Sequence, residues 1–271
     1  MFSEMYARRM KAAFWAAVAV FGIAAVLLLT EPPESPEDWL NVSMIAVTGV
    51  VLLAVSASSR NKLNDSKKIP IPESGTPIEE LDHLIIKRDP GFFPKLLLFS
   101  RTGESMGEVK PMNVPVLFYP LSFIFKDSLV MLLPVTYGLY RSGGRLLLTL
   151  KRKGLKRSAV AINDPHGIQL GMYIQEDFKS LAKTKGVVKN SAGEVILSGE
   201  LKNFSGDFSF LDTDGRHAVR FDNGFFPHEL TGLFRDMDND IVYLNEGSGV
   251  GQNRLLLLAA VAYLFLEKSV R

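Results

Sequence analysis

The stretch that decides the fold is LLLLAAVAYLFL, residues 255–266, near the C-terminus. Arg254 precedes it, Glu267 and Lys268 follow it, and every position between them is apolar. A helix of this length rises about 18 Å, well short of the roughly 30 Å of hydrocarbon in a bilayer. Such a helix is typical of a buried core. We therefore predict a central helix at about 253–267, with a short third membrane span as the alternative.

Four segments before this helix have the pattern of β-hairpins. They lie at 96–110, 159–174, 187–201 and 208–221, and each consists of an apolar run, a polar turn containing glycine, and a returning run. Asn, Asp and Gly recur in these turns because tight hairpin turns require positive φ. Regularly spaced hairpins indicate an antiparallel barrel or sandwich. Together with the terminal helix, they predict a mainly β fold, a closed antiparallel β-barrel around a C-terminal hydrophobic helix, over residues 81–271.

This combination resembles the tubby C-terminal-like superfamily, which includes tubby domains, phospholipid scramblases and LURP-one-related proteins. The residues that carry the resemblance are INDPHGIQLG, VKNSAGEVILSGEL, FLDTDGRHAVRFDNGFFP and LLLLAAVAYLFLEKS. It covers roughly residues 81–271 and implies a closed barrel with a hydrophobic helix through its centre. In scramblases the Phe-Pro run leads almost directly into that helix, whereas about 25 residues intervene here. No scramblase metal segment is therefore carried over.

The N-terminal residues 1–60 have the composition of a two-helix transmembrane hairpin. Residues 12–29 and 39–59 contain no charged side chain, and a spanning helix needs about 20 apolar residues. The connecting TEPPESPED breaks the helix with prolines and remains hydrated through its acids. A cleaved signal peptide is the competing interpretation of the first span, but no small-x-small cleavage site follows it.

The basic residues beside the spans predict their orientation. Arg8, Arg9 and Lys11 precede the first span, and no Lys or Arg lies in the connecting loop. The residues that follow the second span include Arg60, Lys62, Lys67 and Lys68. Because positive residues favour the cytoplasmic side, we expect a multi-pass protein of the cell membrane with both termini cytoplasmic. Residues 61–80 are polar and rich in Pro, Ser and Gly, which predicts a flexible linker.

Residues 114–140 are apolar but contain Lys126 and Asp127 near their middle, and three prolines. Charges in the middle of a membrane are expensive, so we predict buried strands with a turn at Lys126-Asp127. A re-entrant or membrane-resting segment is the alternative.

Catalytic motifs are weak throughout the chain. Gly103-Glu104-Ser105-Met106-Gly107 matches GxSxG, but no helix follows it as a nucleophile elbow requires. The glycines at 247–251 lack a surrounding βαβ unit, so a turn into the barrel is favoured over a phosphate site. The chain has no cysteine, and its four histidines lie far apart. We expect neither an enzyme nor a cofactor, and the near-neutral charge argues against nucleic-acid binding.

A weak calcium candidate lies at Asp236, Asp238 and Asp240, which alternate as in the opening of an EF-hand loop. Ile241 stands where that loop needs glycine, and Gly247 stands where it needs a bidentate glutamate. An acidic surface loop is the alternative, and no metal is predicted.

The best functional lead is a run of basic residues without an acid between them. It consists of Arg145, Lys151, Arg152, Lys153, Lys156 and Arg157. A strand or loop of this charge would attract an anionic leaflet, and the resemblance to tubby domains implies binding of phosphoinositide headgroups through basic side chains. A solvated charged edge is the plain alternative. We expect a membrane-anchored cytosolic domain that binds or senses anionic lipid. A membrane scaffold and a scramblase-like lipid transporter are the alternatives, and the sequence identifies no protein partner.

Overall fold

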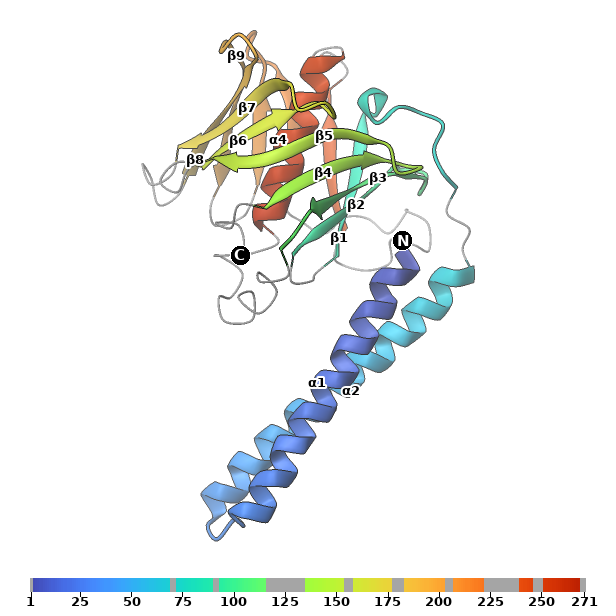
Figure 1. Ribbon diagram of the computed structural model, residues 1–271, viewed down its shortest axis with the longest axis vertical. Helices are drawn as coiled ribbons and strands as arrows, with labels where there is room; N and C mark the ends of the chain where they lie inside the picture. Colours follow the sequence, from blue (N-terminus) through green and yellow to red (C-terminus); the bar gives the residue numbers. More distant parts are fainter. Residues whose placement is uncertain are drawn as a thin grey trace. The chain divides into compact units, whose positions relative to one another are not determined.

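The computed structural model describes residues 2–68, 72–89, 93–115, 135–153, 158–176, 183–202, 207–221, 239–245 and 251–268 (Figure 1). The chain divides into two compact units, Met1–Pro70 and Ile71–Arg271. Each unit has its own packing and is described by itself. Most of the predicted segment 114–140 lies outside the described residues, including its turn at Lys126-Asp127.

The first unit is an antiparallel pair of helices, α1 (Phe2–Thr30) and α2 (Pro36–Lys68). Small residues form the middle of the seam between them, and the larger Met5, Tyr6 and Leu63 are buried nearer one end. Ala13, Ala17 and Gly49 are buried, and a Cβ atom placed on Gly49 would lie 2.6 Å from the Phe21 ring. The Ser56 hydroxyl donates across the seam to the Met10 carbonyl at 3.0 Å. Small residues and interhelical hydrogen bonds of this kind are typical of membrane helix pairs.

The outward faces of both helices carry large apolar side chains. Leu29 is 84% exposed and Trp15 is 67% exposed, and the pattern continues along both helices. The other exposed apolar residues are Phe14, Val18, Ile23, Val26, Leu28, Trp39, Leu40, Met44, Val47, Val50, Val51 and Leu53. Both helices are long and apolar enough to cross a membrane, judged by length and composition. Small side chains inside and large apolar ones outside form a surface that water would not solvate well.

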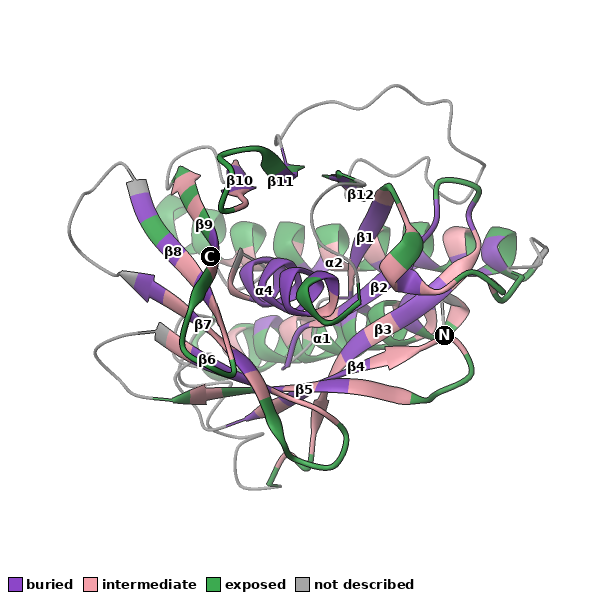
Figure 2. Cartoon of the chain, turned by 90° about the horizontal axis from the view of Figure 1, so that it is seen from above, coloured by how far each residue is buried: buried purple, intermediate pink, exposed green. Residues whose placement is uncertain are grey.

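The second unit is a closed antiparallel barrel of twelve described strands (Figures 1 and 2). A 3-10 turn, η1 (Ile78–Glu80), leads into it. The strands are β1 (His83–Asp89), β2 (Lys95–Phe99), β3 (Ser105–Met112), β4 (Thr136–Arg141), β5 (Leu146–Lys153), β6 (Ser158–Asn163), β7 (Gln169–Glu176), β8 (Lys183–Asn190), β9 (Val195–Lys202), β10 (Phe208–Leu211), β11 (His217–Phe221) and β12 (Asn239–Leu244). Each pairs with its sequence neighbours, and β1 pairs with β12 to close the barrel. The predicted mainly β class, the closed antiparallel barrel with its C-terminal helix, and the four hairpins are confirmed.

One turn geometry recurs in five hairpins of the described chain. In each, the first turn residue bonds through its carbonyl to a glycine three positions later, and through its N–H to the residue after that glycine. The glycines have φ between 77° and 88°, a region of backbone conformation that residues other than glycine avoid. The first residues are Ser100, Arg141, Asp164, Asn190 and Asp212, and the glycines are Gly103, Gly144, Gly167, Gly193 and Gly215.

A β-bulge follows each of these turns at the same position. The strand pairing skips one residue there, and the skipped residue is apolar every time. These residues are Met106, Leu147, Leu170, Ile196 and Ala218, and all of them pack in or against the core. A bulge bends its strand and re-aims a side chain, so each hairpin directs one extra apolar group into the barrel.

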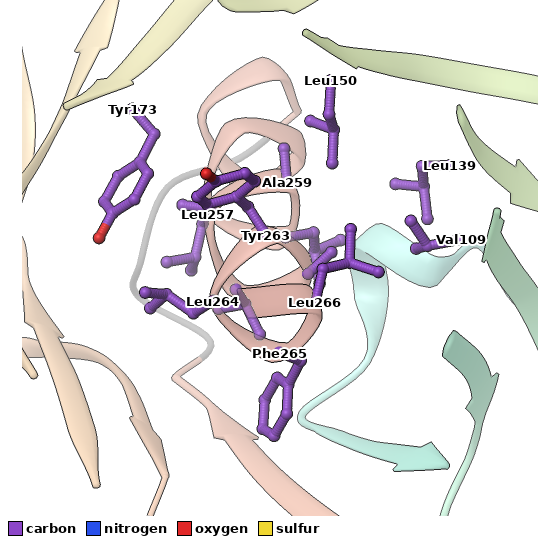
Figure 3. Packing of buried hydrophobic residues seen from close by; sticks show 14 of the residues in the cluster. Val109, Leu139, Leu150, Tyr173, Leu257, Ala259, Tyr263, Leu264, Phe265 and Leu266 are labelled. Carbon is purple, nitrogen blue, oxygen red and sulfur yellow. The ribbon is translucent and has the colours of Figure 1, made fainter. Parts of the chain in front are cut away.

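Helix α4 (Gln252–Lys268) lies inside the ring of strands (Figure 2). Gln252 and Asn253 are exposed, whereas Leu256 to Leu266 are buried without a break. Its bounds exceed the predicted range by one residue at each end. Strand residues such as Val109, Leu139 and Leu150 point toward it (Figure 3). Arg254, 4% exposed, donates to the Leu81 and Asn245 carbonyls at 2.5 Å each. A buried guanidinium is tolerated at this position because backbone oxygens replace its water.

The segment predicted as a flexible linker, residues 61–80, is largely structured. Helix α2 continues through residues 61–68 because the chain there has no glycine or proline. The Ser74 N–H donates to the Ser105 carbonyl at 3.2 Å, and the Ser105 N–H donates to the Pro72 carbonyl at 2.9 Å. Ile78 is fully buried in the barrel core. Only residues 69–71 separate the described part of α2 from the residues that pair with β3. The polar composition of this segment gave no indication that residues 72–74 bond to Ser105 or that Ile78 enters the core.

Candidate functional site

The barrel has two chemically different ends. The five glycine turns all lie at one end, together with the start of α4, and we call this the turn end. The other connections between consecutive strands, which include the long ones at 113–135 and 222–238, leave the strands at the opposite end, which we call the loop end. Strand β5 begins at the turn end with Leu146 and reaches the loop end with Lys153. Basic residues at the two ends of β5 therefore lie at opposite ends of the barrel.

The structure divides the predicted basic run instead of gathering it. Arg145 is exposed in the β4–β5 turn, at the turn end. Lys151 and Lys153 lie near the other end of β5, about 20–26 Å away at 3.3 Å per residue. Lys156 and Arg157 lie outside the described residues. Arg145 therefore does not belong to the same surface as the lysines of β5.

Strand alternation separates Arg152 from its two neighbours. Lys151 and Lys153 are exposed on the outer face, and the Lys153 ammonium donates to the Gln169 side-chain oxygen at 3.3 Å. Arg152 alternates with them and follows the inward-facing Leu148 and Leu150 along β5. Its side chain is half-buried, and its Nε is shielded from water. Successive side chains of a strand point to opposite faces, so a contiguous run cannot form one patch.

The barrel register adds a lysine that the sequence analysis missed. Lys151 lies opposite Ala161, Ala161 opposite Met172, and Met172 opposite Lys189. Lys189 therefore shares an outer row with Lys151, although the two lie far apart in the sequence. We call Lys151, Lys153 and Lys189 the basic rim. A signal for Lys189 was present in the alternation of β8, where Lys185, Val187 and Lys189 share a face.

Lys185 also faces outward on β8, but it contributes less positive charge to this surface. It lies directly opposite Glu200 in the pairing of β8 with β9. The negative charge of Glu200 partly cancels the positive charge of Lys185, so an anionic ligand is attracted less strongly there. On the described strands β6 to β8, the rows that join the lysines of the basic rim contain only Ala159, Ala161, Met172, Ile174 and Val187.

Of the three aspartates of the weak calcium candidate, the structure describes only Asp240. Asp240 lies on β12, is buried, and forms an ion pair with Arg88 at 2.5 Å. The Arg88 guanidinium also lies 5.7 Å from the centre of the Phe265 ring. Asp236 and Asp238 lie outside the described residues. Within the described part of the chain, no three His, Cys, Asp or Glu side chains are grouped to hold a metal.

One buried titratable group faces the interior of the barrel. Burial raises the pKa of the Tyr137 phenol well above its usual value, and nearby Tyr263 adds to the shift. Its hydroxyl is shielded from water, and no hydrogen-bond partner for it lies among the described residues. The Tyr263 ring also contacts that of Tyr173 in a tilted arrangement, with 6.0 Å between ring centres, and the Tyr173 hydroxyl donates to the Gln175 side-chain oxygen at 3.3 Å. This side of α4 therefore carries phenols within an otherwise apolar core.

Comparison with known proteins adds no assignment. No protein-family model matches the chain, and no curated protein matches it.

Proposed function

We propose that the chain is a multi-pass membrane protein whose tubby-like barrel lies in the cytoplasm and binds anionic phospholipid headgroups through the basic rim. The hairpin supplies the anchor in this proposal, with residues 1–11 and the barrel on the cytoplasmic side and the 31–35 loop outside. The barrel is proposed as a binding module with no catalytic role.

The membrane anchor is supported by the distribution of side chains in the first unit, which is the reverse of that in a water-soluble helix pair. Its small residues face the helix seam, and its large apolar residues, such as Trp15, Leu29 and Trp39, face outward. Burying such side chains in hydrocarbon is favourable by about 25 cal/mol per Å² of apolar surface. The Lys and Arg residues that flank the spans favour the proposed orientation.

The observation that carries the lipid-binding proposal is the basic rim itself. Lys151, Lys153 and Lys189 come from two strands and share one outer face, and none of them forms an ion pair in the described chain. A basic residue close to an anionic leaflet contributes about 1 kcal/mol. Three of them would favour the docked barrel by about 3 kcal/mol, or roughly a hundredfold.

The test uses the full chain reconstituted in phosphatidylcholine vesicles with or without phosphatidylserine. Ser198 is exposed and lies opposite Val187, so Ser198→Cys can carry an environment-sensitive dye at the edge of this face. We expect the dye emission to shift to the blue when phosphatidylserine is present. High salt should reverse the shift, because screening weakens surface charge interactions. The combined variant Lys151→Gln/Lys153→Gln/Lys189→Gln should abolish it.

The matched control removes the same charge from the turn end. Arg101, Arg145 and Arg216 are exposed residues of three glycine turns, and all three are changed to glutamine. This variant should keep the shift. Identical emission with and without phosphatidylserine, or loss of the shift in the arginine variant alone, would contradict binding through the basic rim.

A further inference from the structure

Apolar residues gather on the outer face of β6 and β7, and Val187 of β8 adjoins them. Their neighbours Val160, Ile162, Tyr173 and Val188 belong to the core, so the residues that alternate with them face outward. The outward residues that reach the surface are Ala159 on β6, Met172 and Ile174 on β7, and Val187 on β8, and we call them the apolar patch. Ala161 shares this face but is only 1% exposed. Met172, Ile174 and Val187 are partly exposed.

The apolar patch and the basic rim form one surface. One row of the sheet runs from Lys153 through Ala159 and Ile174 to Val187. The next row runs from Lys151 through Ala161 and Met172 to Lys189. Apolar side chains therefore lie between positive charges that come from both sides of the patch.

The barrel itself does not require apolar residues at these positions. The five hairpins have the same glycine turn and the same bulge. Residues of their second strands can therefore be matched by counting from the turn glycine. Where β7 has Met172 and Ile174, the other hairpins have polar or charged side chains on the same outward face. These are Glu108 and Lys110 on β3, Thr149 and Lys151 on β5, Ser198 and Glu200 on β9, and Arg220 on β11. The exception on β7 therefore points to a contact outside the barrel.

We infer that the apolar patch enters the boundary between headgroups and acyl chains of an anionic bilayer while the basic rim contacts the headgroups. This inference rests on the function proposed above. The occupant is a lipid surface because an apolar centre with lysines at its border complements an anionic interface. An anchor in the same chain would hold the barrel at the same membrane.

Two kinds of contact then act together, and they respond differently to salt. Screening weakens the attraction of the lysines but leaves the burial of Met172 and Ile174 largely unchanged. The barrel would consequently respond to acyl-chain packing as well as to surface charge. A surface that used charge alone would respond to phosphatidylserine content and not to packing.

The experiment measures the depth of one position in the apolar patch. The chain has no native cysteine, so Met172→Cys can carry a single nitrobenzoxadiazole dye. The full chain is reconstituted in vesicles of phosphatidylcholine and phosphatidylserine, with a spin label either on the headgroup or at carbon 5 of the acyl chain. Arg220→Cys, at the equivalent hairpin position on β11, carries the same dye as the matched control.

We expect the acyl-chain spin label to quench the dye at position 172 more strongly than the headgroup label does. Neither label should quench the dye at position 220. Ile174→Ser/Val187→Ser in the same background should reduce the docked fraction, with the ratio of docked to undocked barrel falling roughly tenfold. Thermal unfolding of this variant verifies that the barrel remains folded.

The remaining outcomes overturn the inference in distinguishable ways. Quenching by the headgroup label alone would refute insertion and leave the binding of anionic headgroups intact. Quenching by neither label would refute both proposals. Equal quenching at positions 172 and 220 would assign the contact to another face. Protection of position 172 in native membranes but not in lipid vesicles would assign the apolar patch to a protein partner.

Discussion

Replacing Ala260 with aspartate is expected to prevent the barrel from folding. Ala260 is fully buried near the middle of α4, among apolar residues that the strands enclose. A carboxylate at this position has neither water nor a partner, and burying an uncompensated charge costs several kcal/mol or more. Single domains are stable by only about 5–15 kcal/mol. The measurement is urea unfolding followed by circular dichroism, and the variant should lose the cooperative transition of the β signal.

The control for this change is Ala192→Asp. Ala192 is exposed in the β8–β9 turn, so the same chemical change should leave the unfolding transition within about 0.5 kcal/mol of the parent. A folded Ala260→Asp protein with unaltered stability would show that the barrel does not enclose α4.

Replacing Phe265 with alanine is expected to lower the free energy of unfolding by about 3–5 kcal/mol. Phe265 is fully buried, and its ring centre lies 4.9 Å from that of Phe221 and 5.5 Å from that of Phe208. These edge contacts join α4 to β10 and β11. Truncation removes both ring contacts and leaves a cavity that the surrounding strands fill only in part. Urea unfolding of the reconstituted chain gives the change.

Phe265→Leu is the graded comparison for this site. It retains most of the apolar volume and should cost clearly less than the alanine change. A loss below about 1 kcal/mol for alanine would mean that the helix end is not packed as described.

The features predicted correctly from sequence depend on short stretches of chain. The C-terminal helix was predicted because its apolar run is too short to span a membrane and must therefore be buried in the protein interior. The hairpins at Asp164, Asn190 and Asp212 were predicted because these residues and the following glycines are the usual ones in tight turns. Local chemistry was sufficient in both cases.

The features that were missed depend on pairing between distant segments. A closed barrel was predicted, but not which strands close it: β1 and β12 are segments more than a hundred residues apart, and nothing in either strand specifies the other. The β4–β5 turn begins with Arg141, which is not a typical first residue of such a turn, and only the shared hydrogen bonds reveal it. Attachment of the residues near Pro72 to β3 was concealed by their linker-like composition.

The candidate site was predicted only in part, for a geometric reason. A run of basic residues along a strand alternates between two faces and extends over its full length, so adjacency in sequence is a poor guide to adjacency on the surface. Lys151 and Lys153 remain together, while Arg145 lies at the turn end and Arg152 faces inward. Lys189 joins them through the register of four strands, which no local pattern specifies.

The central claim is that α4 is the core of the barrel and not a third membrane span. Three single-cysteine variants, Glu34→Cys, Asp214→Cys and Arg271→Cys, test it most directly, because the native chain contains no cysteine that could also react. A membrane-impermeant maleimide is applied first to intact cells and then after permeabilisation. We predict labelling at position 34 in intact cells, and labelling at positions 214 and 271 only after permeabilisation. Labelling at positions 214 and 271 from opposite sides of the membrane would contradict the account.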